Sequence, residues 1–386
     1  MIIIYFYQLL IKLIKNNLKI FISATEQSGD NIGYNLIKEI IKKNDQITFE
    51  GVGGEKMSSL LNKQFFSLKD FNTMGIFEVL FSIRKFIKMI KYLANIIKNN
   101  NYDLVITIDS PDFNYPLVKE IKKNKYNKNI IHIVAPTVWA WREYRAKNFA
   151  KIYNELLVLF EFEIKYFIKY GLRTNLIGHP IYYIEKNKSY FKKNKNIAFL
   201  PGSRLSELDK LFPYFQNAYE YLLIHNPNIT IFIPTLEHLK PKILKLTKNW
   251  KLKIIISTNS QENEKNYSYC SKALVCSGTA SLEIAKRNIP QLIIYKLNFF
   301  TELIAKNFIK VKYANILNIL ENELIIPEIT NSNLNKISFE KGFKKLINDN
   351  KSNDEQIYKI NKILKNIETK NPPFYSAAIR ILANLN

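Results

Sequence analysis

Short apolar runs alternate with longer segments of helical periodicity along almost the whole chain, and this alternation is the strongest constraint on the fold. A strand buried on both faces is apolar throughout, whereas a covering helix is apolar on one side. The alternation predicts an α/β fold of parallel sheets with helices on both faces. Strands are expected at 19–23, 47–52, 104–108, 130–134, 156–159 and 174–177, and then at 197–200, 230–234, 253–257, 273–276 and 291–295.

A polar segment rich in lysine and asparagine, residues 185–196, separates the two series of strands. A chain of 386 residues also exceeds the size at which a single hydrophobic core usually stops growing. We therefore expect two Rossmann-like domains facing a central cleft. The first would span residues 18–185 and the second residues 186–386, with the last helix as a candidate to cross back to the first domain.

Residues 1–17 precede the first expected strand and form an extension whose role the sequence leaves open. Residues 1–14 are apolar, but they are shorter than a membrane span and are interrupted by Gln8 and Lys12. They lack the charged start and the cleavage site of a signal peptide. An additional helix, an interfacial anchor and a start codon assigned too early are the three interpretations.

The composition limits the classes of function. The formal charge of +24 accompanies many Lys, Asn and Ile residues and few Arg and Ala residues, as an AT-rich genome would produce. No basic block is interleaved with aromatic residues, so we expect no nucleic-acid partner. The two cysteines cannot form a disulfide framework, which favours a cytoplasmic protein. The four histidines have no metal-ligand spacing, so no metal site is expected.

Polar residues and glycines gather where the expected strands end, which is where open α/β sheets bind ligands. Nine of the 11 glycines lie at or beside strand ends or turns into helices. After the first strand, Glu26 and Ser28 precede a helix whose amides could bind an anion or a sugar. The alternative is that Ser28 or Asp30 only caps the helix. The glycines of residues 51–54 lack the spacing of a dinucleotide fingerprint.

Two carboxylates follow the buried strand 104–108. Asp109 and Asp112 stand at its carboxyl end, a suitable position for general-base chemistry. Asp112 follows Pro111 and could instead cap the next helix, so Asp109 is the better candidate for the base. Trp139 lies in a proline-containing loop after the next strand, where its ring could contact a sugar or an acyl chain. Packing between the domains explains Trp139 equally well.

The second domain contains two turns suited to a nucleoside diphosphate. Ser203 and Arg204 follow strand 197–200 in a Pro-Gly-Ser-Arg turn, although Arg204 could instead pair with Glu207 at the surface. After strand 273–276, a second turn presents hydroxyls and amides at a helix start, where the helix dipole favours phosphate. A carboxylate one turn along this helix could accept both ribose hydroxyls. The residues of the second turn and helix are Ser277, Gly278, Thr279 and Glu283.

The order of these motifs resembles the lipid-A-disaccharide synthase family from Lys19 to about Pro327. Two departures occur: Thr25 stands where the family usually has glycine, and Glu321-Asn322-Glu323 replaces a family run that contains an arginine. The matching segments are ISATEQSGD, GVGGEKM, MG with FEVL, IDSPDFN, PTVWAW, GHP, LPGSR with SE, SGTASLE, YKLNFFTELIAK and VKYANILNIL.

The resemblance implies a GT-B fold, with the acceptor in the first domain and the donor nucleotide in the second. It implies transfer of 2,3-diacylglucosamine from UDP-2,3-diacylglucosamine to 2,3-diacylglucosamine 1-phosphate, with a β-1,6 link and release of UDP. Asp109 would be the base of an inverting displacement that needs neither metal nor cofactor. Asn318, which matches the family, would contact the nucleotide or sugar. A peripheral position on the cytoplasmic face of the inner membrane is expected, and a homodimer is left open.

Two other functions fit parts of the pattern. Another UDP-sugar enzyme of the same architecture, such as a 2-epimerase, would share the nucleotide turns. A basic membrane-surface protein without catalysis would use residues 1–14 and the helix expected near 76–99. The paired carboxylates and the tryptophan loop argue against the first alternative. The retention of Arg204 and Glu283 argues against the second.

The helix expected near 76–99 contains more apolar residues than one buried face needs. We expect Phe77, Leu80 and Phe81 to form a partly exposed patch beside the acceptor site, flanked by lysines and an arginine. Such a mixture of apolar and cationic side chains favours an anionic membrane surface. The isoleucines that follow the helical period are expected to pack against the sheet of the first domain: Ile83, Ile87 and Ile90.

Overall fold

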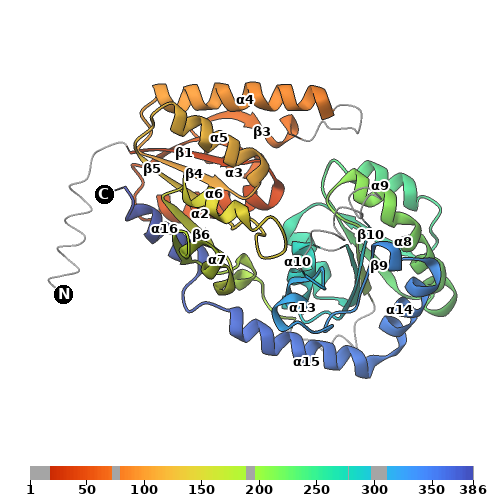
Figure 1. The fold of residues 1–386 in the computed structure, drawn as a ribbon. Coiled ribbons are helices and arrows are strands. Elements are labelled where there is room, and N and C mark those ends of the chain that lie inside the picture. The colour runs from red at the N-terminus through yellow and green to blue at the C-terminus, as the bar shows by residue number, and fades with distance from the viewer. Residues whose placement is uncertain (1–17, 72–78, 188–195, 277, 297–310, 386) are drawn as a thin grey trace. The chain divides into compact units, whose positions relative to one another are not determined.

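The computed structural model describes residues 18–71, 79–187, 196–276, 278–296 and 311–385. These residues divide into two compact units (Figure 1). Unit 1 comprises residues 1–182 and 369–386, and unit 2 comprises residues 183–368. The C-terminal segment therefore belongs to the same unit as the first strands.

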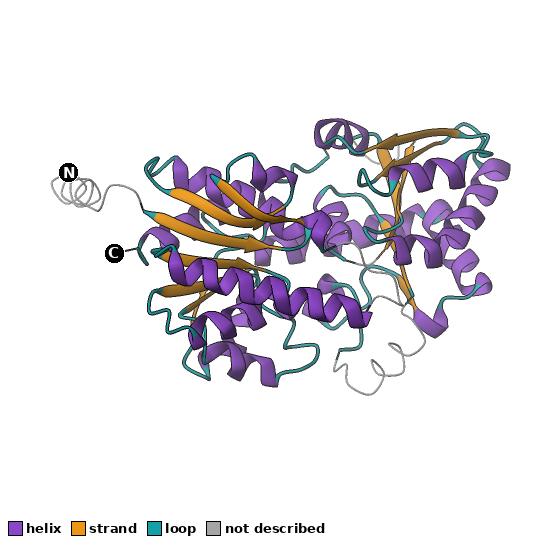
Figure 2. Ribbon diagram, turned by 90° about the horizontal axis from the view of Figure 1, so that it is seen from above, coloured by secondary structure: helices purple, strands orange, loops and turns teal. Residues whose placement is uncertain are grey.

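In the described part of unit 1, seven parallel strands form one sheet in the order β3-β2-β1-β4-β5-β6-β7. Helices lie on both faces of the sheet (Figure 2). The strands are β1 (Lys19–Ala24), β2 (Thr48–Gly53), β3 (Lys63–Ser67), β4 (Leu104–Ile108), β5 (Asn129–Ile133), β6 (Glu155–Val158) and β7 (Arg173–Leu176). The helices are α2 (Gln27–Ile41), α3 (Glu55–Ser58), α4 (Val79–Asn99), α5 (Pro111–Lys123), α6 (Tyr144–Ala150), α7 (Ile164–Ile168) and α16 (Pro373–Leu382), with 3-10 turns at Leu68–Asp70, Glu161–Glu163 and Pro180–Tyr183.

The described part of unit 2 contains a six-stranded sheet in the order β10-β9-β8-β11-β12-β13, again with parallel neighbours. Its strands are β8 (Asn196–Leu200), β9 (Thr230–Pro234), β10 (Lys253–Ser257), β11 (Cys270–Cys276), β12 (Gln291–Tyr295) and β13 (Glu328–Thr330). Its helices are α8 (Leu205–His225), α9 (Lys240–Thr247), α10 (Ser260–Tyr267), α11 (Thr279–Lys286), α13 (Ile316–Glu321), α14 (Lys336–Asn348) and α15 (Asn350–Ile367), with a 3-10 turn at Asn331–Asn333.

The central strands of both sheets and the edge strands β7 and β10 lie where the apolar runs predicted them, whereas the edge strands β3 and β13 were missed. β3 reads KQFFS and is exposed or half-buried throughout, and β13 has only 3 residues. An edge strand pairs on one side only, so it needs no continuous apolar run. These strands therefore lack the pattern that identifies the central ones.

Alternate residues of each central strand in unit 1 enter two different cores. Ile20 and Ile22 of β1 pack with residues of α2 and α16, whereas Phe21 packs with residues of α4 and α5. Figure 1 shows these two pairs of helices on opposite faces of the sheet. Burial on both faces explains why the strands are apolar throughout.

A buried carboxylate fixes the C-terminal helix α16 to the sheet of unit 1. Glu155 of β6 is fully buried and forms ion pairs with Arg173 and Arg380. Its oxygens also accept hydrogen bonds from Asn384 Nδ2 at 2.7 Å and Asn175 Nδ2 at 2.7 Å. Burial opposes ionisation, but the donors outweigh it and lower the pKa of Glu155.

The long helix α4 presents an apolar and cationic face to solvent, which corrects one expectation. Ile83 and Ile87 are 49% and 47% exposed, whereas Met89 and Leu93 are the residues that enter the core. The expected packing of Ile83 and Ile87 against the sheet is therefore wrong, and Ile90 is half-buried. The side chains of Phe77, Leu80 and Phe81 lie outside the described residues. Within the described ranges, no helix combines the length and apolar character needed to cross a membrane.

Candidate active site

Asp109 and Ser28 are brought together at the carboxyl edge of the sheet in unit 1. β1 and β4 are parallel neighbours with Ala24 opposite Ile108, so the segments that follow these strands emerge side by side. The Ser28 hydroxyl donates to Asp109 Oδ2 across 3.4 Å, and the Ser110 amide donates to Asp109 Oδ1 across 2.8 Å. Asp109 is partly exposed, as a base that must reach a substrate should be.

The backbone at this edge is strained. Among the described residues other than glycine and asparagine, five have positive φ, and four of these follow β4 or β5: Asp109 (52°), Ser110 (46°), Val134 (75°) and Arg142 (52°). Positive φ is most unusual for a β-branched residue such as Val134. Strain of this kind concentrates at functional sites, because the surrounding structure must maintain it.

Asn114 holds the turn that carries Asp109. Its side chain is fully buried, and Nδ2 donates to the carbonyl oxygens of Ile108 (3.2 Å) and Asp109 (2.8 Å). Its Oδ1 accepts from the hydroxyl of Ser23, at 2.9 Å. Asn114 thus connects the ends of β4 and β1 and fixes the direction in which Asp109 leaves the sheet. The sequence motif IDSPDFN contained Asn114, but its pattern did not separate this role from helix capping.

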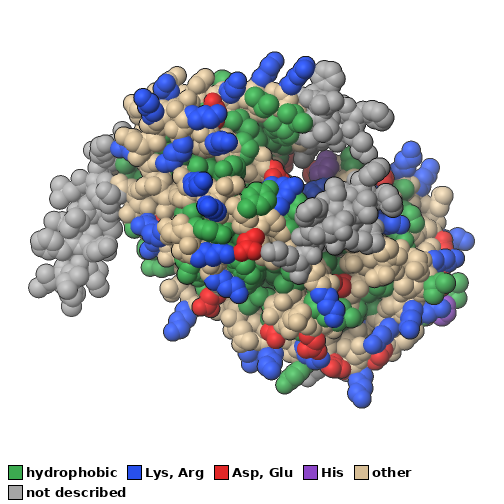
Figure 3. Space-filling model, viewed as in Figure 1, with side chains coloured by type: hydrophobic (Ala, Val, Ile, Leu, Met, Phe, Trp, Pro, Cys, Tyr) green, Lys and Arg blue, Asp and Glu red, His purple; other side chains and the backbone are tan. Residues whose placement is uncertain are grey.

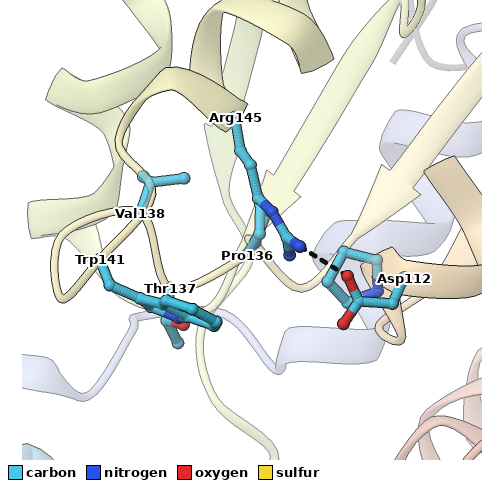
Figure 4. Close-up of a pocket in the computed structure, with 7 residues that line it drawn as sticks. Asp112, Pro136, Thr137, Val138, Trp141 and Arg145 are labelled. Carbon is cyan, nitrogen blue, oxygen red and sulfur yellow. Dashed lines mark hydrogen bonds and ion pairs between the residues drawn. The ribbon is translucent and has the colours of Figure 1, made fainter. Parts of the chain in front are cut away.

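A pocket of about 140 Å³ lies beside this turn, where β4 and β5 end (Figure 4). The Arg145 guanidinium extends from α6 and contacts Asp112 Oδ1 at 2.6 Å. Asp112 therefore forms an ion pair, and no side-chain cap stabilises the start of α5. The residues lining the pocket are Pro111, Asp112, Pro136, Thr137, Val138, Trp141 and Arg145.

Trp141, and not the expected Trp139, lines this pocket. Trp139 packs edge-on against Phe162, with ring centroids 5.6 Å apart and an interplanar angle of 70°. The Arg142 guanidinium lies 3.9 Å from the centroid of the Trp141 ring. The sequence pattern named Trp139 and neither Trp141 nor Arg145, and the contact of Trp139 with a sugar or an acyl chain stays a prediction. The two arginines that follow Trp141 in the sequence could have indicated both Trp141 and Arg145 as candidates.

Glu26 and Asp30, near the start of α2, have different surroundings. Glu26 is exposed at the N-cap position, where its side chain makes no capping bond. Asp30 is fully buried, and its carboxylate accepts from the amides of Gly54 (2.7 Å) and Met57 (3.0 Å). A Cβ on Gly54 would lie 2.6 Å from Asp30 Oδ2. Gly54 thus allows the close approach of the backbone to Asp30, whereas a Cβ on Gly51 would meet the Ile22 carbonyl and one on Gly53 would meet Met57. Glu26 remains a candidate sugar contact.

The Pro-Gly-Ser-Arg turn follows β8 in unit 2, and a carboxylate from the first turn of α8 accepts hydrogen bonds from its amides. Glu207 Oε2 accepts from the amides of Ser203 (3.0 Å) and Arg204 (3.3 Å). Gly202 has φ 113°, and a Cβ there would lie 2.5 Å from the same oxygen. Both Arg204 and Glu207 influence the pKa of Cys276, the last residue of β11, which burial raises to about 12. β8 pairs with β11, with Leu200 opposite Val275, so the turn that carries Arg204 emerges beside the end of β11.

The second turn of unit 2 opens α11. Gly278 has φ 140°, and no described atom lies within 4 Å of the position that its Cβ would occupy. Gly278 and Thr279 are exposed, whereas Ser277 lies outside the described residues. Glu283 Oε2 is 3.9 Å from Nη1 of the buried Arg287, and the Glu283 side chain is 45% exposed. The structure thus places an open turn and a partly exposed carboxylate on one helix.

Asn318 does not reach a ligand-binding surface. It is fully buried, and its Nδ2 donates to the Ile326 carbonyl at 2.8 Å. Its Oδ1 accepts from the amides of Ile325 (3.0 Å) and Ile326 (2.9 Å). In this structure the Asn318 side chain does not make the expected contact with the nucleotide or sugar. Its amide is hydrogen-bonded to the segment before β13 instead.

Two histidines of unit 1, the fully buried His132 and the half-buried His179, are held by hydrogen bonds. Burial lowers the pKa of His132 to about 3 and that of His179 to about 4, so both are neutral near pH 7. His132 shares a hydrogen bond of 2.7 Å with the Thr107 hydroxyl, and His179 Nδ1 accepts from the Ile181 amide at 3.1 Å. Within the described residues, no three Asp, Glu, His or Cys side chains form a group that could hold a metal ion.

Two parallel-sheet units with polar and glycine-rich turns at their carboxyl edges define a GT-B type fold. Solved structures share this fold at low sequence identity. S. aureus MnaA with UDP matches with a TM-score of 0.58 and 13% identity, covering 95% of each chain. Acinetobacter baumannii MurG matches with a TM-score of 0.53 and 11% identity, covering 92% of this chain and 99% of that chain.

Sequence comparisons assign the family within this fold. The model of the Lipid-A-disaccharide synthetase family matches residues 20–379. The Lipid-A-disaccharide synthase of Gluconobacter oxydans is 31% identical over 95% of this chain and 91% of its own length. That of Rickettsia prowazekii is 34% identical, with coverages of 93% and 97%. The chain belongs to the lipid-A-disaccharide synthetase family, and its function is lipid-A-disaccharide synthesis by a glycosyltransferase of GT-B fold. The epimerase and non-catalytic alternatives are thereby set aside.

Proposed function

We propose that the chain transfers 2,3-diacylglucosamine from UDP-2,3-diacylglucosamine to the primary hydroxyl of 2,3-diacylglucosamine 1-phosphate, with inversion and release of UDP. The position of Asp109 carries this proposal. Its carboxylate is partly exposed, is oriented by Ser28 and Ser110, and stands on a strained turn. Asp109 takes the proton from the acceptor hydroxyl as the hydroxyl oxygen attacks the anomeric carbon. The β-1,6 bond forms as the bond between that carbon and the diphosphate breaks.

The donor contacts are proposed at the two turns of unit 2. The guanidinium of Arg204 and the amides of the exposed residues Gly278 and Thr279 suit the negative charge that develops on the departing diphosphate. Glu207 accepts from the amides of Ser203 and Arg204, so it competes with the diphosphate for them. Fixed donors and a guanidinium can balance this charge, which supports metal-independent transfer. Ser277 and Glu283 complete the proposed donor set, with Glu283 on the ribose.

Substitution of Asp109 tests the proposed base. Removal of a general base typically lowers turnover by a factor of about 100 to 10,000. Asp109→Ala should therefore lose turnover to this extent while it binds UDP with unchanged affinity, because the proposed UDP contacts lie in unit 2. Disaccharide formation and UDP release are measured together with the two acylated substrates. Asp45→Ala, at an exposed aspartate after α2 in the same unit, is the matched control. Turnover of Asp109→Ala within about threefold of wild type would remove Asp109 from the mechanism.

A peripheral position on the cytoplasmic face of the inner membrane is proposed from the exposed face of α4. Its apolar residues Ile83 and Ile87 alternate with exposed Arg84, Lys85 and Lys88. Figure 3 shows lysine and arginine side chains along the edge where α4 lies, with hydrophobic side chains between them. This combination suits an interface that is both apolar and anionic. Docking on the membrane would bring the enzyme to the surface in which the acyl chains of both substrates are embedded.

Sedimentation with anionic liposomes tests membrane docking. The double variant Ile83→Ser and Ile87→Ser should pellet several-fold less than wild type at low salt, because two apolar contacts are lost. Ile337→Ser is the matched control, since Ile337 is 82% exposed on α14 of unit 2. Equal pelleting of the double variant and the wild type would refute docking through this face of α4.

A further inference from the structure

The pocket between the ends of β4 and β5 is lined by residues to which the reaction scheme above gives no role. Its volume is about 140 Å³, and its lining includes Trp141, Thr137 and Arg145 (Figure 4). All of its lining residues belong to unit 1. Asp112, on its rim, is three positions along the chain from Asp109. The pocket is therefore a separate feature that adjoins the proposed base.

The side chains around the pocket favour an anionic sugar. Two guanidinium groups lie near the Trp141 ring, that of Arg142 at 3.9 Å and that of Arg145 at 5.9 Å from its centroid. Aromatic rings pack against the apolar faces of sugars, and the planar guanidinium matches phosphate oxygens with two parallel hydrogen bonds. The exposed Thr137 hydroxyl adds a further donor.

The ion pair with Asp112 holds the Arg145 guanidinium in place and leaves N–H donors for an anion. The Arg145 side chain is 19% exposed and the Asp112 side chain is 81% exposed. The guanidinium is thus largely removed from water while its partner carboxylate remains solvated. A guanidinium has five N–H donors, and the contact with Asp112 involves Nη2. Desolvation strengthens the interaction of the remaining donors with a phosphate.

We propose that this pocket binds the phosphate-bearing end of the acceptor sugar, with Arg145 on the phosphate, Trp141 against the ring and Asp112 as a positioning residue for Arg145. The inference rests on the proposed function, because it assigns a place to the phosphate of that acceptor. Holding the phosphate here leaves the primary hydroxyl of the same sugar for Asp109. The enzyme would then select acceptors that carry the phosphate.

Direct binding tests the pocket without requiring turnover. N-acetylglucosamine 1-phosphate and uncharged N-acetylglucosamine are titrated into the full chain by calorimetry. The wild type should bind the phosphate sugar at least about tenfold more tightly than the uncharged sugar. Arg145→Ala should remove this preference, Arg145→Lys should restore part of it, and Lys147→Ala, an exposed cation on the same helix, should retain it. An undiminished preference in Arg145→Ala would overturn the proposal, provided that circular dichroism and UDP affinity match wild type.

Steady-state kinetics separates failure of the pocket from failure of the proposed function. In Arg145→Ala the KM for the acceptor should rise at least about tenfold, with the KM for the donor unchanged. Asp112→Asn should raise the acceptor KM less and leave kcat near wild type. If wild type forms the disaccharide and Arg145→Ala has a normal acceptor KM, the pocket assignment alone is wrong. If wild type forms no disaccharide from the two acylated substrates, the proposed reaction is wrong, whatever the binding result.

Discussion

Asn114→Ala is expected to lower both the stability of unit 1 and the rate of transfer, because the Asn114 side chain holds the turn that carries Asp109. The substitution removes hydrogen bonds to Ile108 and Asp109 and leaves the buried Ser23 hydroxyl without its acceptor. A buried polar group left unsatisfied costs about 1–3 kcal/mol, so we expect a total loss of about 3 kcal/mol. In a unit of roughly 200 residues this corresponds to a fall in Tm of about 6–12 °C.

The kinetic effect of Asn114→Ala should exceed the effect of lost stability. Positive φ costs about 1–2 kcal/mol at a residue with a side chain, and the bonds from Asn114 offset that cost at Asp109. Without them the turn relaxes, and kcat at 20–25 °C should fall about 100-fold, within the range for loss of a base. Calorimetric Tm, kcat and UDP affinity are measured on this variant and on Asn100→Ala, an exposed asparagine with one backbone bond. A folded Asn114→Ala protein with kcat within about threefold of wild type would show that Asn114 does not hold Asp109 in its catalytic position.

Two further predictions concern the nucleotide site and the attachment of the C-terminal helix. Arg204→Ala and Glu283→Ala should each weaken UDP binding about ten- to hundredfold, since a charged hydrogen bond contributes roughly 1.5–3 kcal/mol; calorimetry that finds unchanged affinity in both would place the nucleotide elsewhere. The pKa of Glu155 is lowered in the folded state, so its contribution to stability is present above its unfolded pKa and is lost as pH falls through the folded value. Glu155→Gln should therefore lower Tm at pH 7 and flatten the dependence of Tm on pH below about 4, and a normal acid limb in that variant would contradict the assignment.

The fold class followed from the local sequence pattern, and so did the positions of the candidate residues at strand ends. The central strands are apolar because helices cover both faces of the sheets, and this property is visible in any short window of sequence. Polar residues directly after such strands must emerge at one edge of a parallel sheet. Asp109, Ser28, Arg204 and Gly278 could therefore be placed at ligand-binding edges before their neighbours were known.

Tertiary structure alone decided which of several similar side chains performs which role. Trp139 and Trp141 are two positions apart and chemically identical, and only packing against Phe162 removes Trp139 from the pocket. Asn318 follows a family motif, but its buried contacts are with residues seven and eight positions further along the chain. On α4, Ile83 shares the helical period of Ile97, which is fully buried, so the sequence could not indicate that Ile83 faces solvent.

The return of the C-terminal helix to unit 1 also depends on partners that are distant in the sequence. Glu155 meets Arg380, which lies 225 positions further along the chain. The sequence around a charged residue in a strand does not indicate which charged residue in a terminal helix pairs with it. Periodicity shows which face of an element is apolar, but it does not show which element covers that face. The local sequence pattern therefore determines the helices, the strands and the residues at the edge of each sheet. The packing of the whole unit determines which side chains these residues contact.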